Sequence, residues 1–265
     1  MNEVFFVKHH GKNLISLKQY SDGAIKMEKK PHLIWKEWNL PFSRHSSEVL
    51  KIVNVQKGMN VVDVAVGEGR YAIPMSKTGA SVTGIDNSDF IISNLKKKLD
   101  THNVSIKIVK QDIREAFPIE EGSFDISASL GTMVHIDRYE DVCNELYRVT
   151  KPGGRVVIEF SNKFHITSVL EKLYQYADLI IRRKKFSERV PIYLRSLNEG
   201  LAPFKDKNCK INYYGFYPIL PNGLPVLGAK GGIIQHIPGL SYGLKKFKPL
   251  VPFCQIIMIE VEKIG

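Results

Sequence analysis

Short apolar runs alternate with longer amphipathic segments along residues 43–162, and this alternation predicts most of the fold. Apolar runs bounded by turn signals are typical of buried strands, whereas apolar positions three and four apart are typical of helices that cover a sheet. The expected strands begin at Val61 and then cover 81–86, 104–109, 124–130, a stretch ending at Phe160, 210–217 and 253–261. The expected helices cover 43–55, 68–76, 88–99 and 139–149. This order predicts a mainly parallel α/β sheet with helices on both faces, which binds ligands at the carboxyl ends of its strands.

Outside this alternation the pattern is weaker. Residues 3–20 are expected to form a hairpin that turns at Gly11 and Asn13. Residues 166–181 and 186–197 are expected to form helices, which we interpret as a lid; a helix pair covering the sheet edge and a basic helix on a membrane surface are the alternatives. The expected parts are an N-terminal cover at 1–42, a ligand-binding core at 43–162, a helical insertion at 163–208 and the last two strands at 209–265.

The turn after the first expected strand is rich in small residues and leads into a helix. It reads VVDVAVGEGR over residues 61–70. Gly67 and Gly69 let the backbone approach a ligand closely and tolerate the positive φ of a tight turn. Asp63, at the end of the strand, can accept hydrogen bonds from loop amides or from a ligand's amine. A strand-to-helix turn without a ligand has the same features, so this loop is informative only in combination with other motifs of the chain.

Acidic residues also stand at the end of the second expected strand and shortly after the third. Asp86 lies 23 residues after the acid of the first strand, the spacing at which a carboxylate takes the ribose hydroxyls of a nucleotide. Asn87 or Ser88 can cap the helix that comes next, because a short side-chain oxygen accepts from the free amides of the first turn. Asp112 and Ile113 come after the third strand, an acid and an apolar residue suited to bracket a flat base.

Five motifs in this order resemble those of class I S-adenosylmethionine-dependent methyltransferases. They are VVDVAVGEGR at 61–70, GID at 84–86, QDI at 111–113, SLGTMVHI at 129–136 and TKPGG at 150–154. The resemblance covers about residues 43–162 and is greatest to the small-molecule branch that contains the ubiquinone and menaquinone C-methyltransferases. It implies a Rossmann-like, seven-stranded, mainly parallel sheet with one antiparallel edge strand, covered by the N-terminal extension and by the segment after the fifth strand.

The resemblance also implies S-adenosylmethionine as the cofactor, with S-adenosylhomocysteine as its product. By this resemblance the methionine part would lie among Asp63, Gly67 and Gly69, the ribose at Asp86, the adenine at Asp112 and Ile113, and the amino group at the backbone near Leu130. Ala65 in the loop and Asn87 beside the ribose acid complete the expected cofactor-binding set.

The glycine loop departs from the family pattern at two positions. Ala65 stands where the family has its first glycine, and Val66 stands where a cysteine or a small polar residue is common. The extra methyl of Ala65 is tolerated if that residue keeps a negative φ. These departures keep open the alternative of a non-catalytic relative that binds the cofactor as a regulatory or assembly protein.

His135, just past the fourth expected strand, is the candidate catalytic base. Methyl transfer from a sulfonium needs the acceptor atom held in line with the methyl group in a site that excludes water, and an oxygen or nitrogen acceptor also needs a base for its proton. A structural histidine that fixes the loop is the alternative role for His135. Glu159, His45 and Tyr20 are further candidates, and no His-Glu-x-x-His or clustered acidic motif indicates a metal.

Composition fits one globular enzyme domain with attachments. The chain has 265 residues, of which 43% are hydrophobic and 25% charged, as is usual for soluble proteins. No apolar run resembles a signal peptide, and no uncharged apolar stretch reaches the length of about 18 residues that a membrane span needs. Cys143, Cys209 and Cys254 are spaced for neither a disulfide framework nor a metal site. The expected location is therefore the cytoplasm, with reduced thiols.

Basic residues are concentrated outside the expected core. Lys and Arg outnumber Asp and Glu by 7 to 4 in residues 1–42, 10 to 5 in 163–208 and 6 to 2 in 209–265, whereas the core has 15 against 16. A positive field over the substrate entrance would favour an anionic substrate or surface. A solvated lysine-rich face is the plainer alternative.

The leading hypothesis is a methyltransferase that acts on a small molecule. An RNA methyltransferase is the competing hypothesis, because the isoelectric point is about 9.4. The sequence does not support this hypothesis, because it has no Asn-Pro-Pro-Tyr motif, no Pro-Cys loop and no separate RNA-binding module. Substrate, acceptor atom and oligomeric state are left open.

Overall fold

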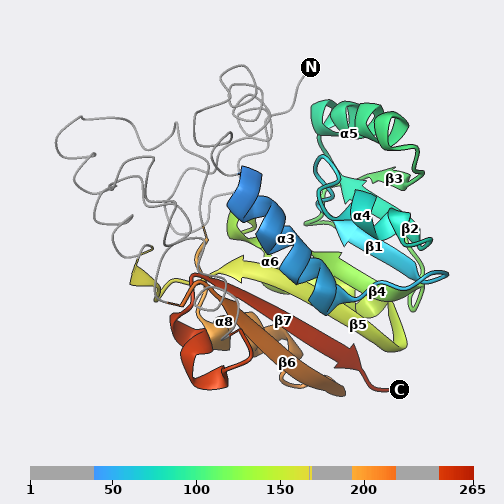
Figure 1. Cartoon of the computed structure of the whole chain (residues 1–265). Helices are drawn as coiled ribbons and strands as arrows, with labels where there is room; N and C mark the ends of the chain where they lie inside the picture. The colour runs from blue at the N-terminus through green and yellow to red at the C-terminus, as the bar shows by residue number, and fades with distance from the viewer. Residues whose placement is uncertain (1–38, 167, 169–192, 219–244) are drawn as a thin grey trace, which may run out of the picture.

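A seven-stranded sheet organises the residues that the structure describes (Figure 1). The computed structural model describes residues 39–166, 168, 193–218 and 245–265. The strands are β1 (Asn60–Val64), β2 (Ser81–Asp86), β3 (Lys107–Lys110), β4 (Phe124–Ser129), β5 (Thr150–Ser161), β6 (Cys209–Phe216) and β7 (Ile256–Lys263).

The strand order reverses between β1 and β4. Across the sheet the order is β3-β2-β1-β4-β5-β7-β6, and every neighbouring pair from β3 to β5 is parallel. Ligands of such sheets bind outside the carboxyl ends of the strands at the reversal. β7 runs antiparallel to both of its neighbours, with Ile259 opposite Ile158 of β5 and Tyr213 of β6. The predicted antiparallel pairing at one edge is thus confirmed, with β6 outermost and β7 one place inside.

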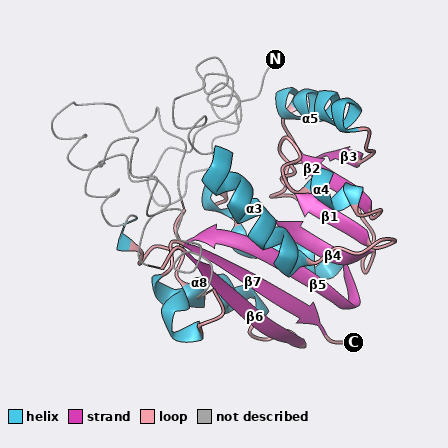
Figure 2. Ribbon diagram, in the orientation of Figure 1, coloured by secondary structure: helices cyan, strands magenta, loops and turns pink. Residues whose placement is uncertain are grey.

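Helices cover both faces of the sheet, as predicted (Figure 2). One face carries α3 (Asn39–Val53), α4 (Ala72–Lys77) and α5 (Asp89–His102); the other carries α6 (Tyr139–Val149), the 3₁₀ helices η1 (Met133–His135), η3 (Ala202–Phe204) and η6 (Lys248–Phe253), and α8 (Leu197–Leu201). Successive strand residues point to opposite faces. Val61 and Val157 therefore pack on the α3 side, and Asp63 and Glu159, two residues further along, face the same side.

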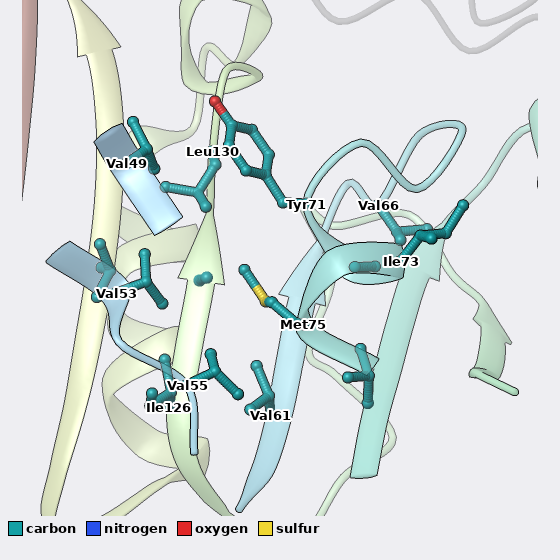
Figure 3. Close-up of a cluster of buried hydrophobic side chains, with 14 of the residues drawn as sticks. Val49, Val53, Val55, Val61, Val66, Tyr71, Ile73, Met75, Ile126 and Leu130 are labelled. Carbon is teal, nitrogen blue, oxygen red and sulfur yellow. The ribbon is translucent and has the colours of Figure 1, made fainter. Parts of the chain in front are cut away.

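Aliphatic side chains form the core beneath α3 and α4. Val49 and Val53 of α3 and Met75 of α4 pack with Val61 of β1 and Ile126 of β4 (Figure 3). All five are almost fully buried. Burial of a side chain of this size contributes about 1.5–3 kcal/mol, so this cluster fixes α3 and the loop before α4 against the sheet.

Several element boundaries differ from the predictions by three or more residues, and two of these differences have a local cause in the backbone. The helix expected from residue 68 begins at Ala72, because Gly67 and Gly69 have φ of 55° and 81° and prolong the turn. The strand expected from residue 104 begins at Lys107. Asn103 ends α5 in the left-handed conformation with φ of 51°, and the residues after it close the helix before the strand can start.

Part of the predicted cover lies outside the described residues. This holds for the hairpin at 3–20, for Tyr20 and for most of the helices at 166–181 and 186–197, so the four-part division of the chain stays a prediction. The insertion ends at α8, where the Ser196 hydroxyl accepts from the Glu199 amide and the Glu199 carboxylate accepts from the Ser196 amide at 2.7 Å. Within the described segments no helix is long and apolar enough to cross a membrane.

Candidate cofactor and active site

The loop after β1 is held in a tight left-handed course. Ala65 has φ of 61°, so the expectation that it keeps a negative φ is wrong. A methyl group in this region is disfavoured by contact with the backbone, at a cost of about 1–2 kcal/mol. Hydrogen bonds fix the loop nonetheless: the Val66 amide donates to the Ile85 carbonyl and the Gly69 amide donates to the Val66 carbonyl, both at 3.0 Å.

Gly67 and Gly69 have different roles in this loop. A Cβ atom added at Gly69 would lie 2.7 Å from Leu95 Cδ1 and 2.9 Å from the side chain of Ile73, so Gly69 lets α4 and α5 pack closely. A Cβ atom at Gly67 would meet nothing nearer than the Ala65 carbonyl oxygen at 4.0 Å. Among the residues that the structure describes, no atom lies at contact distance from this position, as a ligand-facing position requires.

Val66, the second departure from the family pattern, is compensated by a glycine on β2. A Cβ atom at Gly84 would lie 2.8 Å from Val66 Cγ2. Val66 is itself buried in the core under α4. The bulk of the valine therefore turns inward onto the neighbouring strand and leaves the ligand side of the loop unobstructed.

Asp86 joins the glycine loop to the helix after β2. Its Oδ2 accepts from the Gly67 amide at 3.1 Å, and its Oδ1 accepts from the Ser88 amide at 3.1 Å. Burial raises the pKa of Asp86, while backbone amides, including that of Asn87, act to lower it. Ser88, the second of the two predicted caps, is the cap of α5, since its hydroxyl accepts from the Ile91 amide. The two predicted ligand elements, Gly67 and Asp86, are thus brought together.

Asp63 is the most deeply buried of the predicted cofactor acids, with 2% of its surface exposed. The parallel register places it between Gly84 of β2 and Ala128 of β4. Burial raises its pKa to about 8, and the Asp86 carboxylate adds to this effect while Arg70 opposes it. The carboxyl group is therefore mainly protonated at pH 7 in the free protein, and an arriving cation would favour its ionisation.

Arg70 and Tyr71 belong to the site although sequence reasoning did not select them. The Arg70 guanidinium donates to the Tyr71 hydroxyl at 2.6 Å and lies over the Tyr71 ring at 4.4 Å. A Cβ atom at Gly131, after β4, would lie 3.0 Å from an Arg70 nitrogen. Tyr71 lies beside Leu130, and its hydroxyl is directed away from the aliphatic cluster (Figure 3). The signal that could have found Arg70 is its position directly after the second loop glycine.

The end of β4 lies beside the end of β1, where the glycine loop begins. The Ser129 hydroxyl donates to the Val64 carbonyl at 3.1 Å, which ties the ends of β4 and β1 together. Leu130 comes next and is buried, with 5% of its surface exposed. The predicted role of Leu130 depends on its backbone, and this backbone lies at the reversal point of the sheet.

Asp112 and Ile113 lie after β3, as predicted, but their side chains are engaged within the protein. The Arg114 side chain donates from Nε to Asp112 Oδ1 at 3.0 Å and from Nη2 to Oδ2 at 2.5 Å, and the Arg114 amide also donates to Oδ1. Burial acts to raise the pKa of Asp112, but the hydrogen bonds from Arg114 outweigh it and hold this pKa below its usual value. Ile113 packs in the core under α6, so only a small part of its side chain is exposed and could contact an adenine base.

His45 and Glu159, two of the candidate bases, form a buried pair. His45 Nε2 lies 3.1 Å from Glu159 Oε2, and the two residues are 1% and 4% exposed. The imidazole also lies edge-on to Phe216 at 4.9 Å and near Tyr217 at 5.6 Å. Burial acts to raise the pKa of Glu159, but His45 and Arg70 lower it overall. This buried hydrogen bond links α3 to β5.

His135, the predicted base, lies at the end of η1 beyond β4 and is partly exposed. The turn that carries it is clamped by Arg195, which donates to the carbonyls of Met133, at 2.7 Å, and Ile136. Arg195 also lies over the Tyr139 ring at 4.4 Å. Sequence reasoning missed Arg195, because nothing in its local sequence indicates a partner some 60 residues earlier.

The candidate site is built from strand ends and the loops after them. Within residues 39–166, 193–218 and 245–265, no group of three or more His, Cys, Asp and Glu side chains is placed to hold a metal ion. The loop after β1 and the acid after β2 meet through the Gly67–Asp86 hydrogen bond. Asp63 and Arg70 then place one acidic and one basic group beside the loop, which suits a zwitterionic amino acid group.

Comparison with known sequences agrees with this geometry. A family model described as "Methyltransferase domain" matches residues 62–158. Sterol 24-C-methyltransferase of Pneumocystis carinii is 34% identical over 115 residues, which are 42% of this chain and 30% of that protein. Demethylmenaquinone methyltransferase of Oceanobacillus iheyensis is 33% identical over 150 residues, or 54% of this chain and 62% of that protein. The chain thus spans less than two thirds of the length of these relatives.

Solved structures share the fold over nearly the whole chain. Magnesium protoporphyrin IX methyltransferase from Synechocystis PCC 6803, with bound S-adenosylhomocysteine, superposes with a TM-score of 0.64 at 13% identity, covering 93% of this chain and 96% of that one. A possible histamine N-methyltransferase from Thermotoga maritima gives a TM-score of 0.61 at 14% identity, with 93% and 98% covered. These findings agree with one another: residues 62–158 match the methyltransferase domain, and the strand order is that of a fold shared with solved methyltransferases.

Proposed function

We propose that the chain binds S-adenosylmethionine and transfers its methyl group to a small-molecule acceptor. The observation that carries this proposal is the hydrogen bond from the Gly67 amide to Asp86, which joins the loop after β1 to the end of β2. It brings an open glycine loop and a ribose-type acid to one place. The match of residues 62–158 to a methyltransferase domain supports the same function.

In this proposal the strand-end acids hold the nucleoside. The Asp86 carboxylate accepts two backbone amides, one on each oxygen, and a carboxylate has about four lone-pair sites. The Asn87 amide also acts on this carboxylate, and the acceptor capacity that remains takes the ribose hydroxyls. Asp112 takes the exocyclic amine of adenine in place of one hydrogen bond from Arg114, and the exposed edge of Ile113 contacts the base. Asn87 lines the ribose side.

The methionine part is assigned to two residues at the loop, the buried Asp63 and the partly exposed Arg70. Arg70, supported by Tyr71, meets the carboxylate, and Asp63 meets the ammonium group. Ala65, Gly67 and Gly69 form the floor, and the Leu130 carbonyl is the further acceptor for the ammonium group. The incoming positive charge stabilises the ionised form of Asp63, so that cofactor binding and deprotonation of Asp63 are coupled.

The chemical step needs positioning more than it needs reactive side chains. The acceptor atom gives an electron pair to the methyl carbon, the carbon–sulfur bond breaks, and its electrons remain on sulfur as the neutral thioether of S-adenosylhomocysteine. In-line placement and exclusion of water supply most of the rate increase. His135 takes the proton where the acceptor is an oxygen or a nitrogen that must lose one.

The acceptor is proposed to be a mainly apolar small molecule, because the names of the similar proteins refer to a sterol and to demethylmenaquinone. The excess of basic residues in 163–208 and 209–265 favours an acceptor that also has an anionic group or lies at an anionic surface. Free thiols at Cys143, Cys209 and Cys254 support a cytoplasmic location.

Isothermal titration with S-adenosylhomocysteine tests the cofactor site. Asp86→Ala should weaken binding by about 1–3 kcal/mol, since it removes the acceptor of buried polar groups. Asp89→Ala is the matched control, because Asp89 is exposed and pairs only with Lys110 in the described part of the chain. If the Asp86 variant binds S-adenosylhomocysteine as tightly as the wild type does, the ribose is bound by other residues. Tight binding without methyl transfer to any lipophilic or anionic acceptor would favour the regulatory alternative.

A further inference from the structure

The 3₁₀ helix η6 has an apolar stripe on its outer side. Residues three apart lie on one side of a 3₁₀ helix. Val251 and Cys254 form the inner stripe and are 0% and 1% exposed. Phe247, Leu250 and Phe253 share the other stripe, and the two phenylalanines are 53% and 60% exposed.

The inner side of η6 is firmly seated on the edge strand β6. The Gly215 amide of β6 donates to the Lys245 carbonyl at 3.0 Å. A Cβ atom at Gly215 would lie 2.4 Å from Cys254 Sγ and 3.1 Å from Val251 Cα, so the helix and the strand are in close contact. The outer phenylalanines are therefore exposed on a helix that is held firmly in place.

The segment after β5 exposes two further large apolar side chains. Phe164 and Ile166 are 60% and 55% exposed. The Asn162 side chain donates to the carbonyls of Pro252 and Cys254 at 2.7 and 2.8 Å, on either side of Phe253. Its own oxygen accepts from the Phe164 amide at 3.1 Å. The loop that carries Phe164 is thus tied to the end of η6. We call Phe164, Ile166, Phe247 and Phe253 the apolar rim.

The rim lies at the edge of the sheet where the cofactor site is. β5 and β6 end at this edge, and β7 begins there, because it is antiparallel to both. The loop after β5 and η6 are the connections at these three strand ends. An acceptor approaching the site from this side would pass the rim.

Lysines flank the rim; of these, Lys245 pairs with Glu48 at 2.6 Å. The sequence from 245 to 255 is KKFKPLVPFCQ, with three lysines and no Asp or Glu. Lys246 and Lys248 are exposed on either side of Phe247. Lys163, beside Phe164, pairs with Glu199 at 2.7 Å and is 30% exposed. Exposed phenylalanines between lysines suit an interface that is apolar inside and anionic outside.

A second copy of this chain would fit the rim less well. A symmetric contact through the rim would bring Lys246 and Lys248 of each copy close to those of the other, and like charges at an interface are unfavourable. An anionic bilayer has no such conflict: the phenylalanines would enter the region between headgroups and acyl chains, and the lysines would meet the phosphates.

We propose that the apolar rim and its lysines dock the protein on the surface of an anionic phospholipid bilayer. Docking itself is independent of the proposed function. Its consequence for the acceptor rests on that function: docking turns the acceptor side of the site towards lipid, so the acceptor is a lipophilic molecule taken from the bilayer.

Vesicle flotation of the full chain tests docking. Vesicles of phosphatidylcholine with about 30% phosphatidylglycerol should bind the protein, and pure phosphatidylcholine should bind it at least about tenfold more weakly. The double variant Phe247→Ser/Phe253→Ser should lose about tenfold or more in affinity for the anionic vesicles. Lys246→Gln/Lys248→Gln should lose about tenfold, and binding by the wild type should weaken as salt is raised.

Controls separate docking from folding and from cofactor binding. Ile264→Ser removes an apolar residue that is 39% exposed at the far end of β7, and it should bind vesicles like the wild type. All variants should bind S-adenosylhomocysteine equally in the absence of vesicles, so a failed cofactor site and a failed docking surface give different results. Absence of binding to anionic vesicles overturns the proposal. So does a dimer in sedimentation velocity that the phenylalanine variant abolishes, since the rim would then be a protein interface.

Discussion

His45 Nε2 on α3 lies 3.1 Å from Glu159 Oε2 on β5, although 114 residues separate them in the sequence. The hydrogen bond is buried and crosses from the covering helix to the sheet beside Arg70. It is one of several polar links that hold α3. Arg155 of β5 donates to the carbonyl of Val53 at 2.7 Å, at the end of the same helix.

Replacement of Glu159 by glutamine should destabilise the fold by about 1–3 kcal/mol at pH 7, because His45 then loses a charged partner inside the protein. The pKa of Glu159 is lower in the folded state than its ordinary value of 4.5. Its contribution is therefore present above pH 4.5 and is lost as the pH falls through the folded pKa. Urea unfolding at several pH values should give curves for wild type and variant that converge in acid. Glu262→Gln, exposed on β7, is the control, and a pH-independent difference would contradict this account.

Asp63 should give the opposite pH dependence. Its pKa is about 8 in the folded protein against 3.8 in the unfolded chain, so between these values the folded state holds a proton that the unfolded state has released. Stability without cofactor should then fall as the pH rises through this window. Asp63→Asn should flatten this slope, measured as melting temperature from pH 5 to 8.5. Retention of the full slope in the variant would place the responsible group elsewhere.

Ala65→Gly should stabilise the protein by about 0.5–1 kcal/mol. The substitution relieves the strain of a methyl group at φ of 61°, and the greater freedom of glycine in the unfolded chain offsets part of the gain. Ala116→Gly, at an exposed residue with ordinary φ, should instead cost about 0.4–1 kcal/mol. Chemical unfolding gives both values. Losses of equal size in the two variants would mean that the loop is not strained at Ala65.

Gly69→Ala should cost at least about 2 kcal/mol more than Gly58→Ala. Both glycines have positive φ, 81° and 83°, so the backbone penalty is similar. Only at Gly69 would the new methyl group overlap Leu95 and Ile73, because at Gly58 no atom of the described part of the chain lies within 4 Å of the added carbon. Thermal unfolding gives the melting temperatures of both variants, and the difference between them measures the cost of overlap with Leu95 and Ile73. Equal melting temperatures would show that α4 and α5 can move apart without cost.

The sequence predicted the parallel core and the meeting of Gly67 with Asp86 because both depend on local pattern. Strand ends of a parallel sheet share one edge, so acids placed directly after apolar runs are brought together by topology alone. The left-handed conformation of Ala65 was not predictable in the same way, since its φ is set by the hydrogen bond from Val66 to the neighbouring strand.

Contacts between distant segments were the part that sequence pattern could not supply. His45 and Glu159 were each selected as candidate bases, but the pattern gave no sign that they contact each other. The capture of Asp112 by Arg114 is local, yet it depends on a rotamer rather than on periodicity. The clamp of Arg195 on the turn of His135 joins the end of the insertion to the loop after β4.

The inner position of β7 has a consequence for how the protein matures at the ribosome. β7 comes after β6 in the sequence but lies between β6 and β5. While β6 emerges, the backbone edge of β5 has no partner, and β6 can join the sheet only after residues 256–263 have been made. Because η6 leads directly into β7, it can take its place on β6 only once residues 256–263 have been made, whereas β1 to β5 all come earlier in the chain and can pair before either of them.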